Sequence, residues 1–160
     1  MSDMSIGDKK FMLEAIQLSI DNVQKGGGPF GAVIVKDGKI IAKGANSVTL
    51  LNDPTAHAEV NAIRKAAEVL GTFDLSGCEI YTSCEPCPMC LGAIYWARLD
   101  KIYYGNTKND AKNIGFDDSF IYDELDKPLE ERKVPAIQME QEKALEAFKL
   151  WDENENKIEY

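Results

Sequence analysis

Two short segments of the sequence hold side chains that could bind one metal ion together. The first, residues 55–59, contains His57, the only histidine of the chain. The second, residues 84–90, contains Cys87 and Cys90, three residues apart. One imidazole and two thiolates are typical zinc ligands, and three protein ligands leave the fourth tetrahedral position for water. The residue types therefore predict a catalytic zinc site rather than a closed structural one.

Glu59 lies two residues after His57, which is too close in the chain for a comfortable second ligand. A bound zinc ion lowers the pKa of its water from about 15.7 towards roughly 7. Glu59 is placed to take a proton from that water and to pass it to a substrate. We therefore interpret Glu59 as the catalytic residue beside the three zinc ligands.

The cysteines also allow other interpretations. A Cys-x-x-Cys pair can be a redox pair, and Cys84 could replace one of the ligands. Cys84 or Cys78 could also add a fourth ligand, which would make the zinc structural. We favour Cys87 and Cys90 because Pro86 places them, and not Cys84, at a helix start, where the helix dipole favours thiolates. On this interpretation Cys78 and Cys84 are small buried residues near a strand.

A helix and a β-hairpin are expected before the first zinc ligand. Residues 9–24 carry apolar side chains at helical spacing, and Asp8 is a plausible N-cap. Residues 30–36 and 39–45 are rich in β-forming side chains, and the Asp-Gly pair between them is a strong hairpin signal. Two antiparallel strands should therefore precede the segment that contains His57.

Helices and strands alternate after the hairpin. The expected helices are 56–70, 87–96 and 142–152, with short helical turns in 109–126, and the expected strands are 79–82, 101–105 and 134–140. This alternation is typical of an α/β fold, here one domain built as a three-layer α/β/α sandwich with a central five-stranded mixed sheet. In the last helix, Ala144, Leu145, Phe148 and Trp151 are expected to face inward.

Composition and charge limit the class of protein. The chain has 160 residues, of which 44% are hydrophobic and 28% charged, as in a globular domain. Residues 117–160 carry 14 acidic and 6 basic side chains and so account for most of the net charge of −9. An acidic surface disfavours a nucleic-acid partner. There is no apolar run long enough to span a membrane and no signal-peptide core in residues 1–10, so we expect a cytoplasmic protein.

The two zinc segments together match a known signature. His-x-Glu followed by Pro-Cys-x-x-Cys is typical of zinc nucleobase deaminases, and both halves occur here in order, with 30 residues from His57 to Cys87. The chain resembles the cytidine and deoxycytidylate deaminase superfamily, and within it the bacterial guanine deaminases, essentially from end to end. The segments that carry the resemblance are residues 27–33, 52–59, 81–98, 115–122 and 157–160.

The resemblance implies a reaction of purine catabolism, the hydrolysis of guanine to xanthine and ammonia, with one zinc ion per subunit. Glu59 would move protons from water to ring N3 and to the departing amine. Asn46 would hydrogen-bond the purine, Asp118 would contact it or carry protons near its amino group, and Phe116 would pack on the ring. Without the resemblance, Asn46 could satisfy a turn, Asp118 could cap a helix and Phe116 could belong to the core.

The resemblance also implies a homodimer whose subunits exchange their C-terminal segments, about residues 115–160, so that Tyr160 closes the partner's site. The ordinary interpretation of Tyr160 is a frayed chain end. The same chemistry would serve guanosine, cytosine, a triazine such as ammeline, or tRNA adenosine. A different class of protein, a non-catalytic one that uses zinc for stability, is disfavoured because a structural zinc needs no carboxylate at Glu59.

Overall fold

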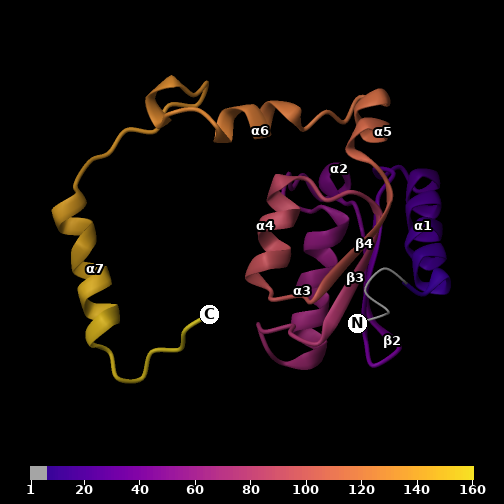
Figure 1. Ribbon diagram of the computed structural model, residues 1–160, viewed down its shortest axis with the longest axis horizontal. Coiled ribbons are helices and arrows are strands. Elements are labelled where there is room, and N and C mark those ends of the chain that lie inside the picture. The colour runs from indigo at the N-terminus through magenta and orange to yellow at the C-terminus, as the bar shows by residue number, and fades with distance from the viewer. Residues whose placement is uncertain (1–6) are drawn as a thin grey trace. The chain divides into compact units, whose positions relative to one another are not determined.

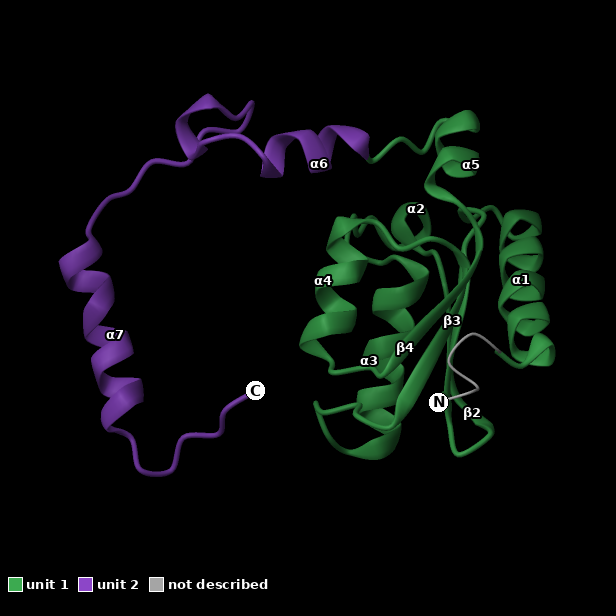
Figure 2. Cartoon of the chain, viewed as in Figure 1, with its two compact units in different colours: residues 1–118 green, residues 119–160 purple. Residues whose placement is uncertain are grey.

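The computed structural model describes residues 7–160, and the chain divides into two compact units (Figure 2). The first unit ends at Asp118 and contains the sheet and the predicted zinc ligands. The second unit runs from Ser119 to Tyr160 and is helical or irregular. Within the described residues, no helix combines the length and the apolar character needed to cross a membrane.

A mixed sheet forms the centre of the first unit (Figure 1). In the described chain it has four strands in the order β2-β1-β3-β4. Their bounds are β1 Gly31–Lys36, β2 Lys39–Ala45, β3 Cys78–Cys84 and β4 Lys101–Asn106. Strand β1 is antiparallel to β2 and to β3, whereas β3 and β4 are parallel. The predicted hairpin is confirmed, and both Asp37 and Gly38 in its turn have positive φ, as tight hairpin turns require.

The prediction of a fifth strand at residues 134–140 is wrong. This segment is irregular, and its apolar side chains, among them Val134 and Ile137, are exposed. Pro135 within the segment lacks the N–H group that a strand would contribute to a ladder of hydrogen bonds. The apolar content of the segment alone therefore misled the prediction.

Helices cover both faces of the sheet, so the predicted three-layer α/β/α arrangement is found in the first unit (Figure 1). Helix α1 (Lys9–Gln24) lies on one face, and α3 (Ala58–Leu70) and α4 (Pro88–Trp96) lie on the other. Alternate residues of a strand point to opposite faces. Accordingly, Val33 packs in the core beside α1, and Ile34 in the core beside α3 and α4.

Small residues bring α3 close to strand β2. A Cβ atom at Gly44 would meet the backbone of α3, with the nitrogen of Ala62 at 2.6 Å. Ala58, Ala62 and Ala66 are fully buried at this contact side of α3. The N-terminus of α3, which carries His57 as its N-cap, is therefore fixed against the sheet.

Two short helices lie near the ends of strands in the first unit. Helix α2 (Val48–Leu51) follows β2, and α5 (Lys108–Asn113) follows β4. Thr107 and Asp110 form a capping box at the start of α5. The predicted first helix is also confirmed with its cap, because the Asp8 carboxylate accepts a hydrogen bond from the Lys10 amide at 3.1 Å.

The second unit consists of α6 (Ser119–Leu125), a short 3-10 turn at Leu129–Glu131 and α7 (Gln141–Glu153). Helix α7 confirms the predicted helix at 142–152. The prediction that its apolar side chains face inward is wrong for this chain, because Leu145 is 49% and Phe148 73% exposed, and Ala144 and Trp151 are exposed too. A unit of this size buries little surface by itself, so these side chains stay uncovered.

Candidate active site

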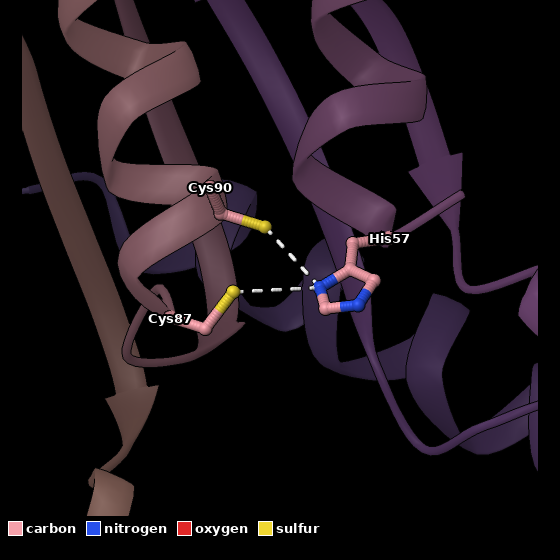
Figure 3. Close-up of side chains that lie close together, drawn as sticks. All are labelled: His57, Cys87 and Cys90. Carbon is pink, nitrogen blue, oxygen red and sulfur yellow. Dashed lines mark hydrogen bonds between the residues drawn. The ribbon is translucent and has the colours of Figure 1, made fainter. Parts of the chain in front are cut away.

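His57, Cys87 and Cys90 meet at the N-terminal ends of two neighbouring helices (Figure 3). His57 is the N-cap of α3 and Cys87 is the N-cap of α4, while Cys90 lies in the first turn of α4. Pro88 occupies the start of α4, where its missing N–H group would be unpaired in any residue. Nδ1 of His57 lies 3.6 Å from Sγ of Cys87 and 3.4 Å from Sγ of Cys90.

These distances fit a zinc ion. Zn–S bonds of about 2.3 Å and Zn–N bonds of about 2.0–2.1 Å at a tetrahedral angle place nitrogen and sulfur about 3.6 Å apart. All three donor atoms lie within 4.8 Å of one another. Cys90 is buried, whereas His57 and Cys87 are partly exposed. The triad thus matches a zinc site with room for a fourth, non-protein ligand.

Cys84 and Cys78 are not part of this triad. Cys84 is the last residue of β3, and its Sγ lies 3.8 Å from the carbonyl oxygen of Thr107. Burial raises the pKa of the Cys84 thiol to about 11. Cys78 is fully buried at the opposite end of the same strand. The structure thus supports the choice of Cys87 and Cys90 over Cys84.

The two thiols of the triad share a hydrogen bond and therefore differ in acidity. The hydrogen bond from Cys90 lowers the pKa of Cys87 to about 4, and His57 adds to this effect. The same hydrogen bond, with burial, raises the pKa of Cys90 far above its ordinary value. The hydrogen bond to Cys87 also raises the pKa of His57.

Glu59 lies in the first turn of α3, next to the triad. Its side chain is only 6% exposed, and this burial raises the pKa of its carboxyl to about 7. The carboxyl also interacts with the Cys90 thiol. A group that titrates near neutral pH can both accept and donate a proton during a reaction, so the environment of Glu59 suits general acid–base chemistry.

Asn46 follows strand β2 and connects the triad to the glycine-rich loop, residues 26–28. It is 8% exposed, and its backbone N–H donates to the carbonyl of Phe30 at 3.1 Å. The next amide, Ser47, donates to the carbonyl of Ala56 at 2.9 Å, directly before His57. Asn46 is thereby held beside the first zinc ligand.

Phe116 and Asp118 lie at the end of the first unit. Phe116 is 49% exposed and meets Phe30 edge to face, with ring centroids 5.0 Å apart. Burial raises the pKa of the partly exposed Asp118 carboxyl, and the nearby negative charge of Cys87 raises it further. The half-exposed Phe116 is not a core residue. Asp118 is close enough to the triad for the charge of Cys87 to affect its pKa.

Phe30 was not recognised as a site residue from the sequence. Its pairing with Phe116 spans 86 positions of chain, which no local pattern reveals. The sequence feature that could have indicated Phe30 is its position directly after the three glycines and Pro29, where a large apolar side chain ends an irregular segment. Tyr160 lies in the second unit and is 71% exposed, and its role stays a prediction.

Comparison with known proteins gives this geometry a family. Residues 5–106 match the model of the cytidine and deoxycytidylate deaminase zinc-binding region. This match includes the three ligands of the triad and Glu59. The chain belongs to the cytidine and deoxycytidylate deaminase family. The resemblance inferred from the sequence is thereby confirmed.

Individual members of the family are similar over different lengths of chain. Guanine deaminase of Bacillus subtilis is 58% identical over 151 residues, which cover 94% of this chain and 97% of the relative. A tRNA-specific adenosine deaminase of Aquifex aeolicus is 40% identical over 129 residues, 81% of this chain and 83% of the relative. The similarity to the Bacillus protein thus reaches further along the chain.

Solved structures of family members also match this chain over different lengths. The X-ray structure of guanine deaminase from Bacillus subtilis has a TM-score of 0.93 at 56% identity and covers 97% of this chain and 99% of that one. A guanine deaminase structure from Nitrosomonas europaea has a TM-score of 0.67 at 34% identity and covers 70% and 65%. The fold described above is therefore shared nearly entirely with the Bacillus protein.

Proposed function

We propose that this protein is a zinc-dependent guanine deaminase, which hydrolyses guanine to xanthine and ammonia. The observation that carries the proposal is the buried Glu59 carboxyl beside a metal site with three protein ligands. The choice of guanine is supported by the Bacillus relative, whose similarity covers the second unit as well as the first. The acidic net charge of −9 speaks against tRNA as the substrate.

The residues of the chain account for the proton transfers that this reaction needs. When bound, zinc supplies the Lewis acid that activates a water molecule for attack on C2 of guanine. Glu59 accepts one proton of that water and delivers it to ring N3, then transfers the second to the departing amine. The oxygen of water thus replaces the 2-amino group, and both protons are accounted for in xanthine and ammonia. A pKa of about 7 lets Glu59 work in both directions near neutral pH.

Three residues are proposed to hold the purine. The Oδ1 atom of Asn46 accepts a hydrogen bond from the Val48 amide at 3.2 Å, which leaves its Nδ2 to donate to the substrate. Phe116, supported edge-on by Phe30, offers an exposed aromatic face for stacking. Asp118, with its raised pKa, is placed to accept or carry a proton of the purine.

We further propose that the protein is a homodimer whose subunits exchange their second units. In this dimer Tyr160 enters the partner's site, and residues 1–160 of each chain are a single deaminase domain. Two helices support this proposal. Helix α4 is apolar on all sides, yet Tyr95 and Trp96 are 70% and 64% exposed. Helix α7 leaves Phe148 and Leu150 more than two-thirds exposed. A helix that is apolar on all sides is normally buried, and large exposed apolar side chains often mark an interaction surface, so each helix calls for a covering surface.

Ammonia release from purines and pyrimidines tests the proposed reaction. The zinc-loaded protein should release one ammonia per guanine consumed. Glu59→Gln should lower kcat by about 10²- to 10⁴-fold with unchanged zinc content, because the proton carrier is lost. Glu68→Gln, an exposed carboxyl on the same helix, is the matched control and should behave as the wild type. If the zinc-loaded protein releases no ammonia from guanine but deaminates another base, the choice of substrate is wrong.

A further inference from the structure

Asn22 is a buried polar residue in the last turn of α1, away from the metal ligands. Its side chain is 6% exposed. Its Nδ2 donates hydrogen bonds of 2.7 Å to the carbonyl oxygens of both Gly28 and Asn46. The backbone carbonyl of Asn22 also accepts a hydrogen bond from the Gly27 amide at 2.9 Å. One carboxamide thus ties helix α1 to the glycine-rich loop and to Asn46.

Asn61 on α3 holds the same stretch of chain from the other face of the sheet. Its Nδ2 lies 2.8 Å from the carbonyl oxygen of Ala45 and 2.8 Å from the hydroxyl of Ser47. Helices α1 and α3 cover opposite faces (Figure 1). The three residues 45–47 are therefore held between two asparagine side chains from opposite layers.

This double attachment holds the backbone from which the side chain of Asn46 projects. Its Oδ1 accepts a hydrogen bond from the Val48 amide at 3.2 Å. An amide whose oxygen is already bonded presents its nitrogen as a donor. The position of that donor depends on the Asn46 backbone, which Asn22 holds directly.

The glycine-rich loop packs closely against Asn22 and Asn46 at Gly27. A Cβ atom at Gly27 would lie 2.5 Å from Nδ2 of Asn22 and 2.9 Å from the carbonyl oxygen of Asn46. The loop continues to Phe30, which supports Phe116 edge-on. The direct bond of Asn22 to a proposed purine contact is the one to the backbone of Asn46.

We propose that Asn22 is a positioning residue for purine binding, which acts by fixing the side chain of Asn46. The inference rests on the proposed function, because it assumes that Asn46 binds the substrate. Asn22 itself touches neither the metal ligands nor the reacting atoms. Its effect should therefore fall on substrate affinity rather than on proton transfer.

Kinetics of Asn22→Ala with guanine give the first test. We expect KM to rise about three- to tenfold, as for the loss of one to two hydrogen bonds, with kcat changed less than twofold and zinc content unchanged. Ser19→Ala is the matched control, because Ser19 is also partly buried on α1 but bonds only to the carbonyl of Ile16. If the KM of Asn22→Ala, measured below the unfolding temperature of this variant, equals that of the wild type, Asn22 contributes to stability alone and the inference is wrong.

A double-mutant cycle shows whether Asn22 acts through Asn46. In an Asn46→Ala background, adding Asn22→Ala should raise KM by less than about twofold, because the group that Asn22 positions is already gone. If both substitutions raise KM independently, the proposed route through Asn46 is wrong. Gly27→Ala, which keeps the carboxamide of Asn22 but displaces it, should raise KM in the same way.

Hydrogen exchange of the Val48 amide tests the positioning without any turnover. This amide bonds to Oδ1 of Asn46, so Asn22→Ala should speed its exchange at least tenfold relative to Ser19→Ala. Unchanged exchange would overturn the inference. A wild-type protein that releases no ammonia from guanine would instead overturn the proposed function, and the Val48 amide would still report whether Asn22 fixes Asn46.

Discussion

The Sγ atom of Cys90 lies 3.4 Å from Nδ1 of His57, although 33 positions separate the two residues in the chain. They meet because α3 and α4 cover the same face of the sheet and their first turns lie side by side (Figure 3). A helix N-terminus favours negative charge on nearby groups, which suits thiolate ligands. The metal site is thus a property of two helix starts rather than of a loop.

Single cysteine substitutions should separate ligands from bystanders. Cys87→Ala and Cys90→Ala should each weaken zinc binding by more than about 100-fold, because two protein ligands remain. Cys84→Ala and Cys78→Ala should keep one zinc per chain, since their thiols lie outside the triad. Zinc content after dialysis, measured by atomic absorption, checks this assignment. Loss of zinc from Cys84→Ala alone would show that the ligand set is wrong.

Zinc binding should release protons and weaken as pH falls. The pKa of Cys90 is raised and that of His57 is raised too, so both hold protons at a higher pH than usual, and zinc must displace them. Affinity should therefore increase from pH 6 to pH 8, the direction set by raised ligand pKa values. Calorimetry in two buffers of different ionisation enthalpy counts the protons released. Binding with no proton release would contradict the hydrogen-bonded thiol pair.

Removal of Tyr160 should damage catalysis and spare the metal. If Tyr160 closes a site, its deletion should lower kcat/KM for guanine by about tenfold or more, the loss expected for one good hydrogen bond. Zinc content should not change, because the triad lies in the first unit. Lys157→Ala in the same tail is a useful control. Kinetics identical to the wild type would remove Tyr160 from the site.

Mixed dimers decide whether the second unit crosses between subunits. A Glu59→Gln chain is expected to be nearly inactive, and a Tyr160-deleted chain to be less active by about tenfold or more. Co-refolded together, they should regain activity if each site combines Glu59 of one subunit with Tyr160 of the other. In each mixed dimer one of the two sites then has both Glu59 and Tyr160, so about half of the sites of that dimer should be active. No recovery would favour a tail that serves its own chain.

The tight contact between β2 and α3 can be tested by adding one methyl group. Gly44→Ala would place Cβ against the carbonyl of Ala58 and 2.6 Å from the nitrogen of Ala62, so we expect a loss of about 1–3 kcal/mol in the free energy of unfolding. Gly92→Ala on α4 has nothing within 4 Å and should be neutral or stabilising by up to about 1 kcal/mol. Urea denaturation measures both, and equal stabilities would contradict the close packing.

The sequence by itself determined the parts of the protein whose signals are local. Asp8 and Gly38 mark a helix start and a hairpin turn within a few residues, so the first helix and the first two strands could be predicted. The ligand types at 57, 87 and 90 and the carboxyl at 59 are likewise set by short spacings, and with them the zinc chemistry. Hydrophobic periodicity and helix-start residues act over one or two turns, which is why a single sequence reveals them.

Only the tertiary structure decided the features that join distant residues. The sequence favoured Cys87 and Cys90 over Cys84, and the structure brings these two together with His57. The sequence also suggested a fifth strand where Pro135 lies in an exposed, irregular segment. Neither the contact of Asn22 with Asn46, 24 positions away, nor the pairing of Phe30 with Phe116 has a local signal. Such contacts depend on how the layers pack around the sheet, and that packing is a property of the whole fold.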